Sequence, residues 1–347
     1  MIKLNWKEPN SVEDVRLLVQ TAIDLEFSTL PPYLYALFSI RPDTNVPAFE
    51  RLHEVIMEEM THMCLACNIM NAIGGSPAVN APSYPGPLPG DVDAGLTVHL
   101  LPLSEAAMQQ GMAIEEPSEA IDPPVLAIAA AAEPNVTIGE YYERLDQALQ
   151  ALPASVWTAN RNQVDDAQFF PGQIFAVNTY DDAHKAIDQI VSEGEGTPVS
   201  PNSPGSPLDF REDLAHYYRF WEIARNQVLV KDDNPVGFAW GAPLGVDWDN
   251  VYPAIADPQL HDFSKESQAV QVAQMACNGA YTGMIYMLTD AFNGVAGGMG
   301  LAVRQMFDLR MAAHAALKTP LADGVSVAGP AFIDLSKQPA TSEGKPQ

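Results

Sequence analysis

The most informative segment of the chain is RLHEVIMEEMTHMCLACNIMNAI, residues 51–73. With the 3.6-residue period of a helix, one face of this segment is apolar along its length except at Glu59 and His62. These two residues are three positions apart and therefore stack on that face. Burying an ionised carboxylate there is costly unless it is paired or binds a metal. The pattern indicates a pair of metal ligands, although a hydrogen bond between the two side chains, or to a buried tyrosine, explains it equally well.

The other face of the same segment has the composition of a solvated surface. Its polar residues are Arg51, Glu54, Glu58, Thr61 and Asn68. On a helix that covers a core with one side, such residues face water. We therefore expect Glu58 to be exposed, while its neighbour Glu59 points into the protein.

A helix predicted at residues 11–40 supplies a second acid of this kind. Glu26 is the single carboxylate on an otherwise apolar or small face of that helix. Pro31 and Pro32 interrupt the helix, remove two backbone hydrogen bonds and are expected to kink it. Glu26 is thus either a metal ligand or a partner for the backbone groups that the prolines free.

A helix predicted at residues 208–228 repeats the pattern of the first segment. Asp213 and His216 are again three positions apart, on a face that also carries Phe220 and Ile223. The charged residues Glu212 and Glu222 lie on its other side. A second acid–histidine pair is much less expected by chance than a single one.

The fourth contribution comes from a helix predicted at residues 180–195, which ends in Ser-Glu-Gly-Glu-Gly. Its apolar row, Ile187 and Val191, projects onward to Glu195. We therefore expect Glu195, rather than Glu193, to be the buried acid, and the choice between them stays open.

Together these helices contain the ligands of a dinuclear carboxylate centre. Such a centre takes one Glu from each of two helices and a Glu-x-x-His pair from each of the other two. Four carboxylates also balance the charge of two divalent ions. The expected ligands, in chain order, are Glu26, Glu59, His62, Glu195, Asp213 and His216. Iron is the expected metal, with manganese or a single metal ion as alternatives.

The rest of the chain surrounds this predicted four-helix bundle, whose second helix spans residues 48–73. Residues 76–178 are rich in proline and glycine and are expected to form a long crossover insertion that folds back as a layer or lid. Two further helices are predicted at residues 264–292 and 300–317. The sequence thus predicts a mainly α single domain over residues 1–335, followed by a disordered tail at residues 336–347.

Composition excludes several classes of partner. The chain has 18 Lys and Arg against 44 Asp and Glu, a formal net charge of −26, which disfavours binding to nucleic acid or to anionic membranes. Its most apolar stretches carry polar residues and glycines, and its first residues lack the apolar run of a signal peptide. With only three cysteines, the chain suits a reducing compartment, and we expect a cytoplasmic location.

The segment LEFSTLPPYL, residues 25–34, resembles the first-helix signature of the ferritin-like domain of iminophenyl-pyruvate dimer synthases. These are metal-dependent enzymes of bisindole pigment pathways such as those of violacein and rebeccamycin. Further matching stretches are Glu59–His62, Pro102–Ser104, Ile114–Pro117, Thr137–Tyr142, Ala186–Ile187, Glu193–Gly196 and Leu214–Phe220. The resemblance spans residues 10–320. It implies a ferritin-like fold and a metal site at the matching positions Glu26, Glu59, His62, Glu195 and His216, which are the residues expected to carry catalysis.

Two positions depart from that pattern. The family usually has Gln where this chain has Glu193, and Asp213 stands where a ferritin-like site has Glu. The shorter reach of an aspartate would leave the second metal weakly bound or absent.

Three functions compete. The first is a non-haem metal-dependent oxidase or oxygenase that uses O2 on a small amino-acid-derived amine, imine or indole in specialised metabolism, with a homodimer as one compatible assembly. The second is a non-catalytic ferritin-like protein that binds or stores iron, but storage bundles add little to their four helices. The third, an interaction protein that has lost its metal, does not explain why the polar set inside the apolar faces is intact.

Overall fold

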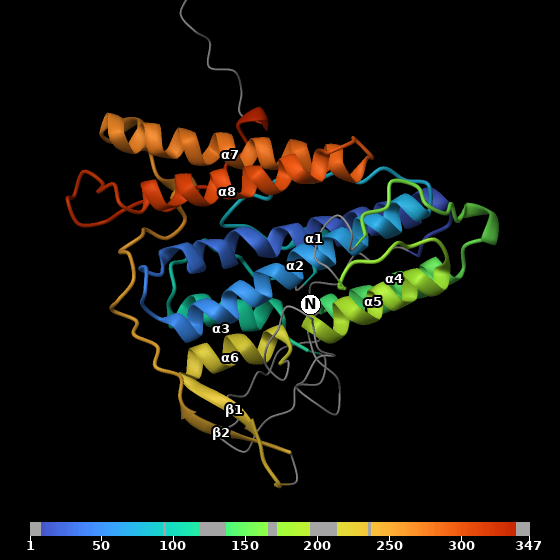
Figure 1. Cartoon of the computed structure of the whole chain (residues 1–347), viewed down its shortest axis with the longest axis horizontal. Coiled ribbons are helices and arrows are strands. Elements are labelled where there is room, and N and C mark those ends of the chain that lie inside the picture. Colours follow the sequence, from blue (N-terminus) through green and yellow to red (C-terminus); the bar gives the residue numbers. More distant parts are fainter. Residues whose placement is uncertain are drawn as a thin grey trace, which may run out of the picture.

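The computed structural model describes residues 8–92, 95–117, 137–165, 172–194, 214–234 and 237–337. This part of the chain is mainly helical and carries one small two-stranded sheet, so the predicted fold class is confirmed (Figure 1). None of its helices is both long and apolar enough to cross a membrane. The predicted tail lies almost entirely outside the described residues. Short 3-10 turns occur at Pro89–Asp91, Ala154–Val156, Pro258–Leu260, Phe263–Lys265 and Leu335–Lys337.

Two long helices, α1 (Val12–Ser39) and α2 (Val46–Ala72), form the centre of the molecule. The side chain of Ser11 caps α1 by accepting a hydrogen bond from the backbone N–H of Asp14. Helix α1 continues through Pro31 and Pro32. Pro32 has no N–H for the carbonyl of Ser28, and the hydroxyl of Tyr84 donates to that carbonyl at 2.6 Å instead. A tyrosine therefore meets this need of the backbone, and Glu26 is free for another role.

Four shorter helices make up the other half of the bundle as two interrupted columns. One column is α3 (Glu105–Ile114) with α4 (Ile138–Gln150), and the other is α5 (Tyr180–Gly194) with α6 (His216–Arg225). Helix α3 packs against α6 and α4 packs against α5. Both α3 and α4 contact α1, whereas α5 and α6 contact α2.

Residues 76–178, predicted to be a long crossover insertion that folds back as a layer or lid, contribute helices that pack in the bundle itself. Helices α3 and α4 belong to that region, yet they form one of the four columns. Two short helices that each cover half of α1 bury the same kind of face as one long helix would. Helical periodicity within each piece does not reveal that they share a column.

Helix α6 is also shorter than the helix predicted at residues 208–228. Ala215 is an extended N-cap residue, and Asn226 ends the helix in the left-handed conformation with φ 55°. The chain then forms the antiparallel strands β1 (Gln227–Lys231) and β2 (Phe238–Pro243). The helix begins at His216, and Asp213, the predicted partner of His216, lies outside the described residues.

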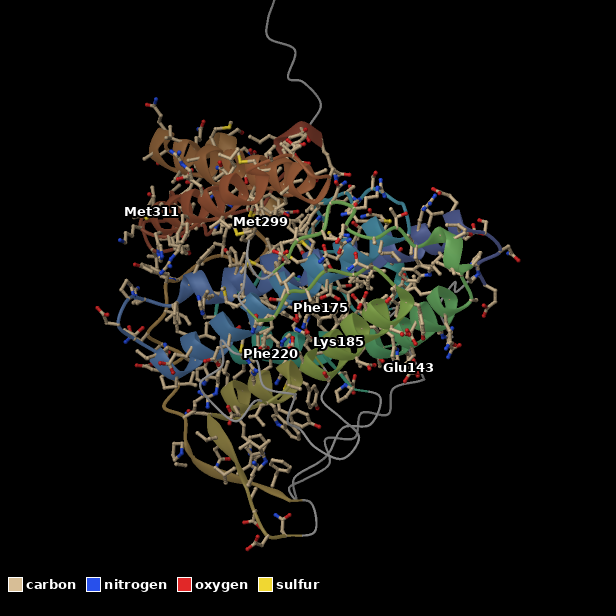
Figure 2. All side chains as sticks on the ribbon, turned by 45° about the vertical axis from the view of Figure 1, so that its right-hand side comes forward. Glu143, Phe175, Lys185, Phe220, Met299 and Met311 are labelled. Carbon is tan, nitrogen blue, oxygen red and sulfur yellow. The ribbon has the colours of Figure 1, made fainter. Side chains whose placement is uncertain are left out.

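The C-terminal hairpin of α7 (Gln268–Phe292) and α8 (Gly298–Ala316) covers the opposite side of α1 and α2. Figure 2 shows this layering: Met299 and Met311 of α8 lie on one side of the central pair and Phe220 of α6 lies on the other.

The prediction that one face of α2 meets water was therefore wrong. Arg51, Glu58, Thr61 and Asn68 are all buried, because α6 and segments that follow α4 pack on this face. Their polar groups have partners inside the protein. Arg51 pairs with Glu222, and the side-chain amide of Asn68 donates to the backbone carbonyls of Val164 and Phe175.

Candidate metal centre

Acidic and histidine side chains gather where the two interrupted columns face the middle of α1 and α2. Helix α1 contributes one acid, α2 two acids and a histidine, and the ends of α3, α5 and α6 the rest. Each of these side chains belongs to a residue at most 5% exposed. The cluster consists of Glu26, Glu58, Glu59, His62, Glu115, Glu193 and His216. We call it the carboxylate–histidine cluster.

Within the cluster, two sets of three residues have ligand atoms that all lie within 4.8 Å of one another. The first set is Glu26, Glu59 and His62, and the second is Glu59, Glu115 and His216. Glu59 belongs to both sets. The two imidazole rings are stacked with their centroids 5.5 Å apart. Two overlapping sets of this kind would suit a dinuclear centre, with Glu59 as a candidate ligand common to both sets.

The Nδ1 atoms of both histidines face the carboxylates of these sets. Nδ1 of His62 lies 3.6 Å from Oε2 of Glu26 and 3.9 Å from Oε1 of Glu59. Nδ1 of His216 lies 2.7 Å from Oε1 of Glu59 and 3.7 Å from Oε2 of Glu115. Each histidine thus points the same ring nitrogen at the space between the acids.

The opposite ring nitrogens are bound by an outer pair of acids. Nε2 of His62 is 2.7 Å from Oε2 of Glu193, and Nε2 of His216 is 2.8 Å from Oε2 of Glu58. The guanidinium of Arg219 donates in turn to Glu58 at 3.2 Å. Histidines that bind metals typically donate their other N–H to a carboxylate in this way, which fixes the tautomer and the ring orientation.

Three hydroxyl groups hold the inner acids in place. Tyr142 donates to Glu26 at 2.5 Å, Tyr33 donates to Glu115 at 2.6 Å, and Thr29 donates to Glu59 at 2.7 Å. Burial, together with the neighbouring carboxylates, raises the pKa of both tyrosines well above its usual value. The two phenols therefore stay protonated and remain hydrogen-bond donors.

The same crowding shifts the titration of the acids and imidazoles. Burial and the nearby charge of Glu115 raise the pKa of Glu59. Burial by itself would lower the pKa of His62, but hydrogen bonds with Glu193 and Glu26 outweigh it and raise the pKa to about 10. The pKa of His216 is raised for the same reason. Its hydrogen bonds with Glu115, Glu58 and Glu59 raise the pKa by more than burial lowers it. In the absence of a cation the cluster therefore retains protons.

The donor set fits a metal. Nδ1 of His216 is fully buried and makes no hydrogen bond within the described residues, although an acid oxygen lies close to it. Imidazole nitrogens and carboxylate oxygens are the ligands that iron and manganese take in such bundles. A cavity of about 20 Å³ borders Glu26, Glu59, His62 and Glu115. It has room for an ion or a water molecule.

The structure brings four of the six predicted ligands together, namely Glu26, Glu59, His62 and His216. The other two, Glu195 and Asp213, lie outside the described residues. That these side chains bind metal stays a prediction.

Glu58 was wrongly expected at the surface; it is buried and orients His216. Glu193, which ranked below Glu195, is buried too and contacts His62. The signal for Glu193 was its position three residues after Ile190, on the most buried row of α5.

Glu115 was not among the predicted ligands. It is the C-cap of α3 and continues the buried row of Met108 and Gly111 at helical spacing. That periodicity could have identified it, but it required α3 to be recognised as part of the bundle.

Comparisons with known proteins agree with this geometry. The family model described as "Ferritin-like" matches residues 19–225, more than half of the chain. A crystal structure of a ferritin-like protein from Caulobacter vibrioides is similar, with a TM-score of 0.64 and 23% sequence identity, and the match covers 92% of this chain and 98% of that one. At this identity the likeness shows the fold alone. No curated protein matches the chain.

Proposed function

Since the chain belongs to the ferritin-like family, we propose that it is a non-haem, metal- and O2-dependent oxidase or oxygenase of the di-iron type. One observation carries this proposal: Glu59 is common to two acid–histidine sets, and each histidine of those sets is oriented by its own outer carboxylate. A buried cluster of this kind has no evident structural purpose, because replacing buried charges by apolar residues usually costs no stability.

The candidate ligands divide into two acid–histidine pairs, one for each metal ion, and one acid common to both. Glu26 and His62 would hold one ion, Glu115 and His216 the other, and Glu59 would serve both. Iron suits these ligands best, with manganese or a single ion as alternatives. Bound ferrous ions would supply the electrons that O2 takes up, which side chains alone do not provide.

The protein's own side chains would orient the ligands, exclude water from the centre and hold protons on the phenols beside the inner acids. Glu193 and Glu58 hold the imidazoles so that Nδ1 faces the inner acids. Tyr33 and Tyr142 stay protonated and keep Glu115 and Glu26 in position. The burial of every member keeps bulk water out of the centre.

For the substrate we propose a small amino-acid-derived amine, imine or indole, in specialised metabolism. The sequence motifs shared with iminophenyl-pyruvate dimer synthases support this class. We also propose a cytoplasmic location and a homodimer. The absence of nucleic-acid or membrane partners is a further proposal, which the net charge of −26 supports.

A second candidate is a non-catalytic protein that binds or stores iron. The cavity of about 20 Å³ at the cluster favours it, because the described residues leave no room there for an organic substrate. Against it, the hairpin of α7 and α8 and the hairpin of β1 and β2 are additions that a storage bundle does not need.

The deciding experiment combines metal analysis with O2 uptake. Protein purified without chelators should contain close to two metal ions per chain, and the ferrous-loaded protein should consume O2 faster when an amine, imine or indole of the proposed class is added. Iron far above that ratio, with O2 uptake that ignores every organic substrate, would support storage instead. The variant Glu50→Gln is a suitable control, because Glu50 is exposed on the same helix as Glu59.

A further inference from the structure

A second and larger cavity lies on the other side of α1 and α2 from the carboxylate–histidine cluster. Its volume is about 650 Å³, within the range of small-molecule binding sites. The end of α1, the first half of α2 and helix α8 form its walls. Apolar side chains dominate the lining, including Leu37, Phe38, Phe49, Ile56, Met57 and Met306.

Helix α2 separates this cavity from the cluster. His53, Ile56, Met57 and Met60 line the cavity. At 100° per residue, these positions lie on the face of α2 opposite to His62. A ligand in this cavity would therefore contact α8 and not the metal ligands.

Basic groups meet at the mouth of the cavity, which is unusual on a chain with 18 Lys and Arg against 44 acids. Arg41, Arg310, His53 and His314 all line it, whereas Asp43 is the one acid among its described lining residues. Arg41 donates to the carbonyl of Val251 and packs over the ring of Tyr252.

Arg310 differs from Arg41 in that it makes no hydrogen bond or ion pair with any residue in the described part of the chain. Burial, followed by the positive charge of Arg310, lowers the pKa of His53 and of His314. The two imidazoles are thus neutral at pH 7 and offer hydrogen bonds, while Arg310 offers the charge.

We propose that this cavity binds a small amphiphilic carboxylate, with its aromatic or aliphatic body between α1, α2 and α8 and its carboxylate on Arg310. An apolar chamber favours the body through burial of apolar surface. A free guanidinium matches the planar carboxylate and forms short, charge-assisted hydrogen bonds with it. The net charge of −26 disfavours anions in general, whereas the basic side chains that line this cavity favour them. The inference does not depend on the proposed function of the metal centre.

Calorimetric titration with phenylbutyrate and with its neutral amide, phenylbutyramide, tests the proposal on the metal-loaded protein. We expect the carboxylate to bind about tenfold or more tightly than the amide. Arg310→Gln should reduce carboxylate binding to the level of the amide. The control Arg304→Gln should leave both unchanged, because Arg304 is exposed on the same helix but does not line the cavity.

A second variant tests the location. Val303 lines the cavity, so Val303→Phe should weaken the binding of both compounds, and a thermal melt verifies that it folds. Equal affinities for the two compounds, or undiminished carboxylate binding by Arg310→Gln, would overturn the proposal. Binding that Glu59→Ala abolishes and Arg310→Gln does not would place the carboxylate at the metal centre.

Sedimentation measurements address the remaining occupant, a second copy of the chain. Phe307 and Met311 are 62% and 70% exposed near this mouth. If the wild type is a dimer that Arg310→Gln dissociates, and phenylbutyrate does not bind, the cavity is a self-association surface and the proposal fails.

Discussion

Glu59 is the acid that the two sets of the carboxylate–histidine cluster have in common. It is buried, it contacts His216 at 2.7 Å, and its other oxygen accepts a hydrogen bond from Thr29. Burial and Glu115 both oppose its ionised form and raise its pKa. Its charge is therefore unfavourable in the metal-free protein, and a cation bound between Glu59, Glu26 and Glu115 would compensate for it.

We expect Glu59→Gln to act in opposite directions on the two forms of the protein. It should remove most of the bound metal, because one shared ligand is lost from both sets, and helicity should be retained. In the metal-free protein it should remove the loss of stability that ionisation of Glu59 causes as the pH rises, because a Gln side chain does not titrate. Elemental analysis and chemical denaturation measure the two effects. Undiminished metal in this variant would contradict the assignment.

The outer acids are expected to tune metal affinity without binding metal themselves. Glu193→Ala removes the partner of Nε2 of His62 and should weaken metal binding about 10- to 100-fold. Glu193→Gln keeps an acceptor oxygen for His62, so its metal affinity should fall much less. Titration against a competing chelator gives both affinities. Equal affinities for these two variants would show that the contact with His62 does not matter.

At the scale of elements, the breaks in the two columns are what allow the cluster to form. Helix α3 ends at Ile114, two residues before the Glu116–Pro117 step, and α6 begins at His216. Pro117 cannot continue a helix. Because these ends meet at the middle of α1 and α2, Glu115 and His216 approach Glu59 from helix termini rather than from helix sides.

The contact between α3 and α6 sets the position of both of those ligands. A Cβ atom on Gly111 would lie 2.7 Å from the ring of Phe220, which is fully buried and packs against Tyr33. We expect Gly111→Ala to destabilise the protein by about 1–3 kcal/mol and to lower metal occupancy, because α3 must move away from α6.

A matched control exists in α7. A Cβ on Gly279 would meet nothing within 4 Å, so Gly279→Ala should be neutral or stabilising by up to about 1 kcal/mol, as expected for an exposed helical glycine. Urea denaturation compares the two variants. If both stabilise the protein, the contact of Gly111 with Phe220 is not tight.

At the scale of the whole molecule, three layers place two different sites on opposite sides of α2. The interrupted columns enclose the carboxylate–histidine cluster, and the α7–α8 hairpin forms a wall of the apolar cavity. The cluster joins side chains from every column of the bundle. Its protonation, and a metal ion bound there, would therefore affect the stability of the entire fold.

The metal-free protein is expected to lose stability as the pH rises above about 6.5. His62 has a folded-state pKa of about 10, above its ordinary 6.5, so its stabilising contribution is complete below pH 6.5 and is lost as the pH rises towards 10. The pKa of Glu59 is raised above its ordinary 4.5, which also makes stability fall as the pH rises. Both shifts have the same sign.

Thermal melts of chelator-treated protein across this range measure the effect, and a melting temperature that rises from pH 6 to pH 9 would contradict it. Metal loading should reverse the trend, because ligands bind metal in their deprotonated forms and the released protons favour binding at higher pH.

Local patterns in the sequence identified the mainly helical fold and the inner residues Glu26, Glu59, His62 and His216, because an acid or imidazole on an apolar helix face is visible within one segment. Glu115, Glu193 and the burial of Glu58 required the packed molecule. Whether a helix has one covered face or two depends on its neighbours. Helix α6 and segments that follow α4 cover the polar face of α2.

The interruption of the columns, and with it the contribution of α3, likewise arises only when short helices stack along α1. Periodicity is a property of single segments, whereas the meeting of helix ends at Glu59 is a property of their assembly.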